Sequence, residues 1–480
     1  MDFQRSNADP CLYFRWEETG LVLWLSWVDD CLIVGHKEQV LHHRNDMMDR
    51  FDCDDVGEMR EYVGCKIERD IQKRRVKITQ PVLLQSFVDE FNITDKPHET
   101  PAVAGETLRK GEPDDCIEQS RTTKYRSGVG KLLHLTKWSR PDIQNAVREL
   151  SRYMSKTMTA HETAMKRTME YCITTKNRGL KLNPNGTWDG KDRNKEFEVT
   201  GYSDSDYAKC QDTRRSVSGY ATFLNNATVT AKSKMQECVT LSVTEAELVA
   251  ATNCVQDMLY NRKILTSLGL TVKQPMILYV DNKGAKDMMN NWSVSGRTRH
   301  VEVRYYFLRE LKEKGIVRIV WVSTENNCSD IFTKNLNGKT FVKHLQKFVT
   351  DEVEAFQEEG VRSDDDVYKI GRPGSGHTMQ SVTEKETTST ERTRQNRDTG
   401  LAGLSVTWHT SVHETNRTRN KMRGKIAVSR ETVREWINQD KSITDNNKYD
   451  SKHTSEPKWD TERNQQNKYG AYASSESVNG

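Results

Sequence analysis

Features typical of secreted, membrane-spanning and zinc-ribbon proteins are missing from this sequence. Its ten cysteines are dispersed without a Cys-x-x-Cys pair, which argues against a zinc ribbon or a disulfide framework and favours free thiols in a reducing compartment. The first residues lack the apolar core of a signal peptide. The apolar stretch 21–35 is shorter than the ~20 residues of a membrane span and contains two acids. We therefore predict an intracellular protein that is not secreted and does not bind a membrane.

A strong net charge is also missing. The formal charge is +4 over 480 residues, so any basic surface for nucleic acid must be local. Hydrophobic residues make up 35% and charged residues 30% of the chain, which predicts folded cores together with a substantial solvated segment. The length allows two to four domains at ~150 residues per domain.

Two acids lie on one predicted strand. The stretch 199–208 contains good strand formers, and strand alternation places Asp204 and Asp206 on the same face. Two carboxylates on one face are costly unless a cation neutralises them. A solvated strand end is an equal alternative for this pair taken alone.

Three further acids occupy contexts that suit a shared site. Glu247 lies in the first turn of a helix whose start is predicted by the capping box from Ser242. Asp281 ends the apolar run 276–280, at the edge where open α/β sheets place their sites. Asp330 follows a predicted strand and begins a helix capped by Asn327 or Ser329. Converging, these acids would form an all-oxygen site for hard cations.

Seven motifs follow one another between residues 196 and 337. They are Gly-Tyr-Ser-Asp-Ser-Asp-Tyr-Ala (201–208), Arg-Arg-Ser-Val-Ser-Gly-Tyr (214–220), Lys-Ser-Lys (232–234), Thr-Glu-Ala-Glu-Leu (244–248), Val-Asp-Asn (280–282), Arg-Thr-Arg-His-Val-Glu-Val-Arg-Tyr (297–305) and Ser-Asp-Ile-Phe-Thr-Lys (329–334). In order and spacing this region resembles the ribonuclease H domain that closes the Pol polyprotein of copia-type LTR retrotransposons.

The resemblance implies an activity and a set of acids. The implied reaction is hydrolysis of the RNA strand of RNA–DNA hybrids with Mg²⁺ or Mn²⁺. The implied catalytic and metal-binding acids are Asp204, Glu247, Asp281 and Asp330. Because the motifs repeat an acid at Asp206 and Glu245, these two residues are the competing choice, and register with the wider ribonuclease H pattern favours Asp204 and Glu247.

Basic residues and one histidine complete the predicted site. The candidate contacts to nucleic acid are Arg214, Arg215, Lys232, Lys234 and Lys334, which flank the acidic stretches. His300 is expected to assist protonation or product release, and a helix-cap or surface role is about equally favoured. In the helical region upstream, Arg140, Lys166 and Arg167 are further candidate contacts, with a solvated helix face as the equal alternative.

Near the N-terminus, two strongly apolar stretches are joined by Asp29 and Asp30. This pattern predicts a hairpin with carboxylates at its tip, although a solvated Asp-Asp turn is common. The motif resembles the reverse-transcriptase palm of the same family, with Trp27 where the family usually has Tyr. The family's other palm aspartate lies upstream of anything present here. Two-metal chemistry needs carboxylates from more than one strand, so no polymerase activity is expected from this chain alone.

The predicted organisation is an α/β protein in four parts. A partial reverse-transcriptase palm (1–95) and a helical, thumb- or connection-like segment (96–195) precede a ribonuclease H-like mixed sheet with flanking helices (196–345). The polar tail (346–480) has few aromatic residues and is expected to be disordered.

The predicted function is that of a retrotransposon Pol fragment with ribonuclease H activity. The expected partners are RNA–DNA hybrid and single-stranded nucleic acid, in a cytoplasmic particle or the nucleus. Two alternatives stay open: a non-catalytic nucleic-acid-binding remnant, and a reverse-transcriptase subunit completed by another Pol chain. An assay for hydrolysis of a hybrid would separate the ribonuclease H enzyme from the non-catalytic remnant.

Overall fold

The structure is a computed structural model that describes residues 2–28, 30–70, 72–290, 302–352 and 365–371. The chain divides into two units, 1–382 and 383–480, and all described residues belong to the first. Within them, strands form three sheets of five or six strands and one strand pair, with helices between them. This mixed arrangement confirms the predicted α/β class.

The first sheet has six strands in the order β1-β2-β3-β4-β18-β5. Their bounds, in sheet order, are Gln4–Arg5, Leu12–Glu17, Gly20–Trp27, Asp30–His36, Asp365–Gly371 and Asp54–Glu58. Strands β3 and β4 form the predicted hairpin, with Trp27 opposite Asp30. Val28 at its tip adopts a positive φ of 55°, and Asp29 lies outside the described residues. Helix α1 (Lys37–Arg50) follows β4.

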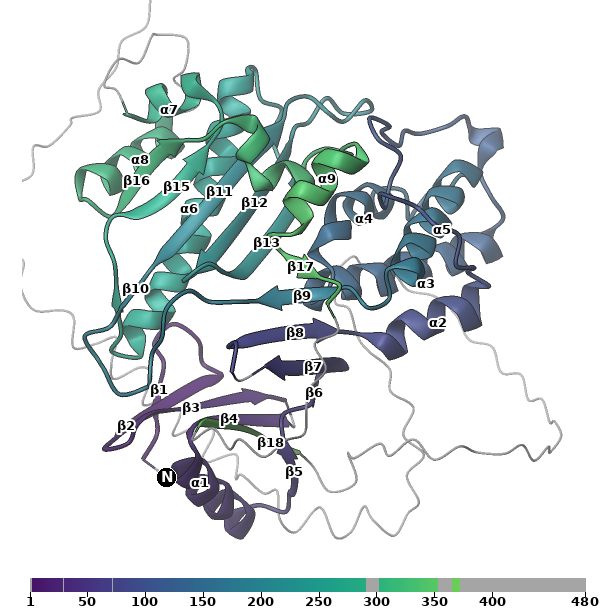
Figure 1. The fold of residues 1–480 in the computed structure, drawn as a ribbon. Coiled ribbons are helices and arrows are strands. Elements are labelled where there is room, and N and C mark those ends of the chain that lie inside the picture. The colour runs from purple at the N-terminus through teal and green to yellow at the C-terminus, as the bar shows by residue number, and fades with distance from the viewer. Residues whose placement is uncertain (1, 29, 71, 291–301, 353–364, 372–480) are drawn as a thin grey trace, which may run out of the picture. The chain divides into compact units, whose positions relative to one another are not determined.

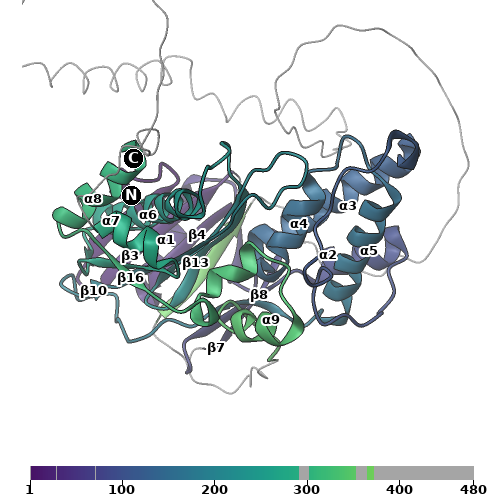
Figure 2. The ribbon, with the colours of Figure 1, turned by 90° about the horizontal axis from the view of Figure 1, so that it is seen from above.

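The second sheet has the order β17-β9-β8-β7-β6. Its bounds in that order are Val349–Thr350, Gly179–Leu182, Arg75–Thr79, Cys65–Asp70 and Glu61–Tyr62. Four helices lie together beside it (Figures 1 and 2): α2 (Pro81–Phe91), α3 (Gln119–Trp138), α4 (Gln144–Ser151) and α5 (Thr159–Thr174). Pro81 occupies the first helical position of α2, as the sequence predicts.

One prediction for the helical region is wrong. Arg140, a candidate contact to nucleic acid, is only 1% exposed. Its Nε and Nη2 atoms donate hydrogen bonds of 2.9 Å to the two carboxylate oxygens of Asp142. The planar guanidinium donates to both oxygens of one carboxylate. The positive charge of Arg140 is therefore paired with Asp142 in the protein interior and does not face a nucleic-acid phosphate.

The third sheet has the order β13-β12-β11-β15-β16. Its bounds in that order are Ala227–Met235, Val217–Leu224, Val199–Asp206, Met276–Val280 and Val317–Trp321. The first three strands are antiparallel neighbours, and β11, β15 and β16 run parallel. The remaining elements are the pair β10 (Glu196–Phe197) and β14 (Thr271–Val272), and helices α6 (Val243–Ser267), α7 (Lys283–Asn290), α8 (Glu302–Glu313) and α9 (Gly338–Leu345).

Helix α6 lies across this sheet and contacts β11, β12 and β15 (Figure 1). Gly201 on β11 lets helix α6 approach the sheet closely, because a Cβ at this position would lie 2.6 Å from Cys254 Sγ and 2.7 Å from Met258 Sδ. On the other side, the apolar core around α2–α5 continues into Phe223 and Phe332. The third sheet and the helical region therefore share buried residues.

The predicted disordered tail, 346–480, differs from expectation in its described residues, because Val349–Thr350 forms β17 with Phe348 buried beside it and a second segment forms β18. Asp365–Gly371 forms β18, which pairs antiparallel with β4 and β5, and its Val367, Tyr368 and Ile370 are residue types enriched in strands. The rest of the predicted disordered segment beyond residue 352 lies outside the described residues. Among the described helices, none combines the length and apolar character that crossing a membrane requires.

Candidate active site

Parallel pairing places two of the predicted acids at one edge of the third sheet. Strands β11 and β15 are in register with Ser203 opposite Val280. Asp204, on β11, and Asp281, directly after β15, are the next residues in each segment. Both therefore lie at the carboxyl ends of the two parallel strands. Asp204 is 1% exposed, whereas Asp281 is only partly buried. Asp281 therefore marks the solvent side of the site.

Glu247 reaches the same edge from helix α6. Ser242 caps this helix by accepting a hydrogen bond from the backbone N–H of Glu245. One turn further, Glu247 Oε1 accepts a 3.2 Å hydrogen bond from the backbone N–H of Ser205 on β11. Glu247 Oε2 is buried and has no hydrogen-bond partner within the described part of the chain. A buried carboxylate oxygen without a donor is costly unless a cation takes that place.

Asp330 lies in the first turn of a helix, as predicted, and this helix is a short 3-10 helix, Cys328–Phe332. The predicted cap is present, since the Asn327 side chain accepts from the backbone N–H of Ser329. The short helix packs on β12 at Gly219, where a Cβ would lie 2.6 Å from Thr333 Cγ2. Gly219 is opposite Asp204, so this glycine admits the segment that carries Asp330 to the site.

Carboxylate oxygens of Asp204, Glu247 and Asp281 lie within 4.8 Å of one another; we call these residues the acidic triad. With Asp330 they form the acidic cluster. Lys334 connects Asp330 to the triad: its Nζ lies 3.2 Å from Asp204 Oδ2 and 3.3 Å from Asp330 Oδ1. The cluster is thus asymmetric. The ammonium group of Lys334 pairs with Asp204 and Asp330, whereas Glu247 and Asp281 have no ion pair with a described cation.

Burial and mutual repulsion raise the pKa of three of these acids. Burial, followed by the charges of Asp204 and Asp281, raises the pKa of Glu247 well above its usual range. Burial and Asp204 also raise the pKa of Asp281. Burial and Asp204 raise the pKa of Asp330 to about 8, against the opposing charge of Lys334. Burial lowers the pKa of Lys334, but Asp204 and Asp330 outweigh it and raise that pKa.

The competing acids lie outside the cluster. Asp206 forms a 3.0 Å ion pair with Lys209. Glu245 Oε2 accepts a 2.7 Å hydrogen bond from the backbone N–H of Leu241 and so serves the start of α6. The geometry thus brings together the acids chosen in the sequence, while their catalytic role stays a prediction.

The basic candidates are distributed unevenly. Arg214 and Arg215 are exposed in the connection between β11 and β12. Lys334 lies within the acidic cluster instead of beside it. His300 and Asp29 fall outside the described residues, and Asp30 begins β4 in the first sheet. Among those candidates that the structure describes, Lys334 is the one that contacts the acidic cluster.

The two lysines of β13 are exposed but face away from Asp204. Through β12, Lys232 aligns with Ser203, which shares its face with Gly201, the position against which α6 packs. Lys234, two residues on, is on the same face and pairs with Glu237 at 2.8 Å. A contact between these lysines and a substrate bound at the acids would require the nucleic acid to extend around the sheet edge.

Two threonines at the site were not identified from the sequence. Thr333 Oγ1 donates to Asp204 Oδ2, and the Thr324 side chain hydrogen-bonds Asp281. Thr333 lies three residues after Asp330 within the Ser-Asp-Ile-Phe-Thr-Lys motif, so helical spacing could have indicated it. Thr324 has no comparable signal, since its position depends on the loop after β16.

The chain is similar in sequence to Pol polyproteins of plant transposons. No family model matches the chain. The retrovirus-related Pol polyprotein from transposon TNT 1-94 of Nicotiana tabacum is 31% identical over 338 residues, covering 69% of this chain and 25% of that protein. The retrovirus-related Pol polyprotein from transposon RE1 of Arabidopsis thaliana is 30% identical over 347 residues, covering 72% of this chain and 23% of that protein. The chain therefore spans about a quarter of the length of these relatives.

Among solved structures, the chain is similar to the N-terminal RNase H domain of a Mycobacterium tuberculosis protein, which was determined as a fusion with maltose-binding protein. It is 12% identical, covers 32% of this chain and 98% of that chain, and gives a TM-score of 0.22.

Proposed function

The chain belongs to the family of retrovirus-related Pol polyproteins of retrotransposons, and from this premise we propose that it hydrolyses the RNA strand of RNA–DNA hybrids at the acidic cluster. The observation that carries the proposal is the convergence of Asp204, Glu247 and Asp281 at one sheet edge, with oxygens within 4.8 Å of one another. Asp204 lies on β11, Asp281 directly after β15 and Glu247 on α6, and the three residues span 78 positions of sequence.

The donor set fits a hard divalent cation. All ligand atoms of the triad are carboxylate oxygens, the type that Mg²⁺ and Mn²⁺ prefer. The buried Glu247 Oε2, which has no partner among the described residues, is a natural ligand. When bound, such an ion lowers the pKa of water and stabilises charge on a phosphoryl oxygen. A second ion at the Asp204–Asp330 side would take the place that Lys334 occupies.

The protein's own groups supply orientation and proton transfer. Thr333 and Lys334 fix both oxygens of Asp204, and the backbone of Ser205 fixes Glu247. Asp281 faces solvent, so the scissile phosphodiester approaches from its side. Asp330, whose pKa is about 8, holds and releases a proton near neutral pH, which suits a general acid for the leaving 3′ oxygen. Selectivity for RNA would come from its 2′-hydroxyl groups.

Two other functions are weighed against this one. A non-catalytic remnant would bind nucleic acid through exposed cations such as Arg214 and Arg215 without cleaving it. A subunit completed by another Pol chain would account for the chain's quarter share of its relatives' length. Neither explains why four carboxylates are gathered where their repulsion raises three pKa values, an arrangement typical of functional sites.

The test uses the full-length chain and a hybrid with a labelled RNA strand. We expect cleavage with Mg²⁺ or Mn²⁺, none with a chelator, and none of duplex DNA. Asp281→Asn should lower the rate by ~100-fold or more, because a ligand worth several kcal/mol is lost. Folded protein that binds the hybrid but leaves its RNA intact with both metals would favour the non-catalytic remnant.

A further inference from the structure

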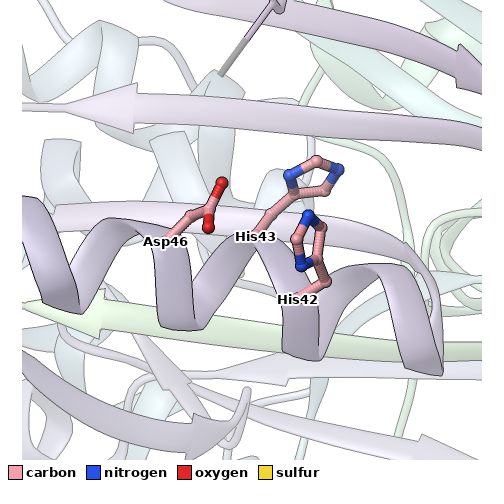
Figure 3. A group of neighbouring side chains, drawn as sticks. All are labelled: His42, His43 and Asp46. Carbon is pink, nitrogen blue, oxygen red and sulfur yellow. The ribbon is translucent and has the colours of Figure 1, made fainter.

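A second group of metal-ligand side chains lies far from the acidic cluster in sequence, on helix α1. It contains His42, His43 and Asp46, whose ligand atoms lie within 4.8 Å of one another. Asp46 follows the two histidines by four and three residues, the spacings at which helical side chains become neighbours. Figure 3 shows the three side chains rising from the same side of the helix.

The hydrogen bonds of His43 leave one of its ring nitrogens available. His43 Nε2 lies 2.7 Å from Glu17 Oε1. Both oxygens of Glu17 act as acceptors, since Gln39 donates to Oε2 at 2.6 Å and Arg15 Nε lies 3.1 Å from Oε1. Nε2 is therefore the donor of the ring, and in the neutral tautomer Nδ1 carries the lone pair.

That nitrogen is buried without a partner. His43 is 1% exposed, and its Nδ1 makes no hydrogen bond within the described part of the chain. The pair with Glu17 explains why a histidine is buried here, but it does not satisfy Nδ1. Leaving a buried polar atom unsatisfied destabilises the folded state. A metal ion bound at Nδ1 would remove this cost.

The remaining ligands are free to complete the site. Asp46 makes no hydrogen bond or ion pair with any other described residue, and its side chain is partly buried. His42 is exposed, with its ring 5.2 Å from that of His43 between centroids. An ion can therefore enter from solvent at His42 and reach the buried nitrogen of His43.

We propose that His42, His43 and Asp46 bind a transition-metal ion of the Zn²⁺ class, with Glu17 orienting His43 from behind. Two imidazoles and one carboxylate are a zinc-type ligand set with a fourth position left for water. A ligating histidine almost always donates its other N–H to a carboxylate or carbonyl, which is the role of Glu17 here. The site differs from the acidic cluster, whose oxygen ligands suit Mg²⁺.

The experiment titrates the full-length, metal-free chain with Zn²⁺ and, in parallel, with Co²⁺ as a visible-absorption probe of the ligand field. His42→Ala and Asp46→Asn remove ligands that are not fully buried, so the fold should persist. We expect each to abolish one equivalent of tight binding, and Glu17→Gln to weaken it by ~10–100-fold. Asp49→Asn, an exposed acid on the same helix, is the matched control and should bind as the wild type does.

Histidine and cysteine side chains are zinc ligands in general, and the chain has others, so the difference between variants is the decisive quantity. A second readout is thermal: Zn²⁺ should raise the unfolding temperature of the wild type and of Asp49→Asn, but not of His42→Ala. Mg²⁺ should not reproduce this rise. Equal stoichiometry, Co²⁺ spectrum and thermal shift in wild type and His42→Ala would overturn the proposal. Its failure would leave hybrid hydrolysis untouched, because the two sites share no residue.

Discussion

The ammonium group of Lys334 lies 3.2 Å from Asp204 Oδ2. Among the described residues it is the cation inside the acidic cluster, and it contacts the acid that strand β11 presents to the site. At this distance its charge offsets part of the repulsion among the carboxylates. Lys334 thus links the electrostatics of the metal-free protein to its metal affinity.

Replacing Lys334 by Met should strengthen the binding of Mn²⁺. Removal of a positive charge about 3 Å from two carboxylates leaves the cluster more negative, and we expect roughly tenfold tighter binding at low salt. Titration calorimetry of the full-length protein measures this. Lys209→Met is the control, because Lys209 pairs with Asp206 outside the cluster. Unchanged affinity in Lys334→Met would mean that the lysine leaves the cluster whenever metal binds.

The choice between neighbouring acids can be tested by two matched pairs. Asp204→Asn and Glu247→Gln should each lower hybrid hydrolysis by ~100-fold or more, since each removes a charged member of the triad. Asp206→Asn and Glu245→Gln should lower it only a few-fold. Glu245→Gln retains an oxygen to accept from Leu241. Rates of RNA cleavage under single-turnover conditions provide the comparison, and a reversed order would exchange the assignment.

Motifs and local patterns predicted most of this arrangement. The capping box placed the start of α6 and hence Glu247, and the apolar run 276–280 placed Asp281 at the end of a strand. The family resemblance is confirmed by the retrotransposon Pol relatives. The prediction for Arg140 failed, because its guanidinium is buried and hydrogen-bonds Asp142 and the distant Thr175. The pairing of Lys334 with Asp204 and Asp330 was not predicted either, while its contact with nucleic acid stays a prediction. Periodicity does not reveal the partners of these cations, because packing decides which residues they meet.

Without metal, the stability of the protein should fall as pH rises through the acidic range. Asp330 keeps its proton in the folded state up to about pH 8, whereas the ordinary pKa of an aspartate is 3.8. The folded state therefore binds more protons between about pH 4 and about pH 8, and the free energy of unfolding falls across that window. The groups titrate together, so we expect a loss of only roughly 2 kcal/mol from this source.

Asp330→Asn isolates that contribution. The variant should unfold at a higher temperature than the wild type at about pH 9 and at nearly the same temperature at about pH 5. Added Mg²⁺ should shrink the difference at high pH, because a bound cation favours the charged carboxylates. Thermal unfolding at the two pH values, with and without Mg²⁺, measures these effects. A pH dependence equal in variant and wild type would show that Asp330 does not titrate with a raised pKa.

Gly219→Ala should damage the site without touching an acid. The new Cβ would lie 2.6 Å from Thr333 Cγ2, 2.9 Å from Phe332 Cβ and 3.0 Å from the carbonyl oxygen of Ser329. Because part of this contact is backbone, the 3-10 helix must shift away from β12, at a cost of ~1–3 kcal/mol. The shift would loosen the hydrogen bond from Thr333 to Asp204 and displace Asp330, so hydrolysis should fall together with stability.

Gly130→Ala is the control for this substitution, because a Cβ at Gly130 on α3 would meet nothing within 4 Å. It should leave hydrolysis unchanged and raise stability by ~0.5–1 kcal/mol, as Ala does in a helix interior. Denaturant unfolding and hybrid cleavage of both variants separate the two outcomes. If Gly219→Ala retained wild-type hydrolysis despite lower stability, the position of the 3-10 helix would not matter to the reaction, and Asp330 would lose its proposed role in proton transfer.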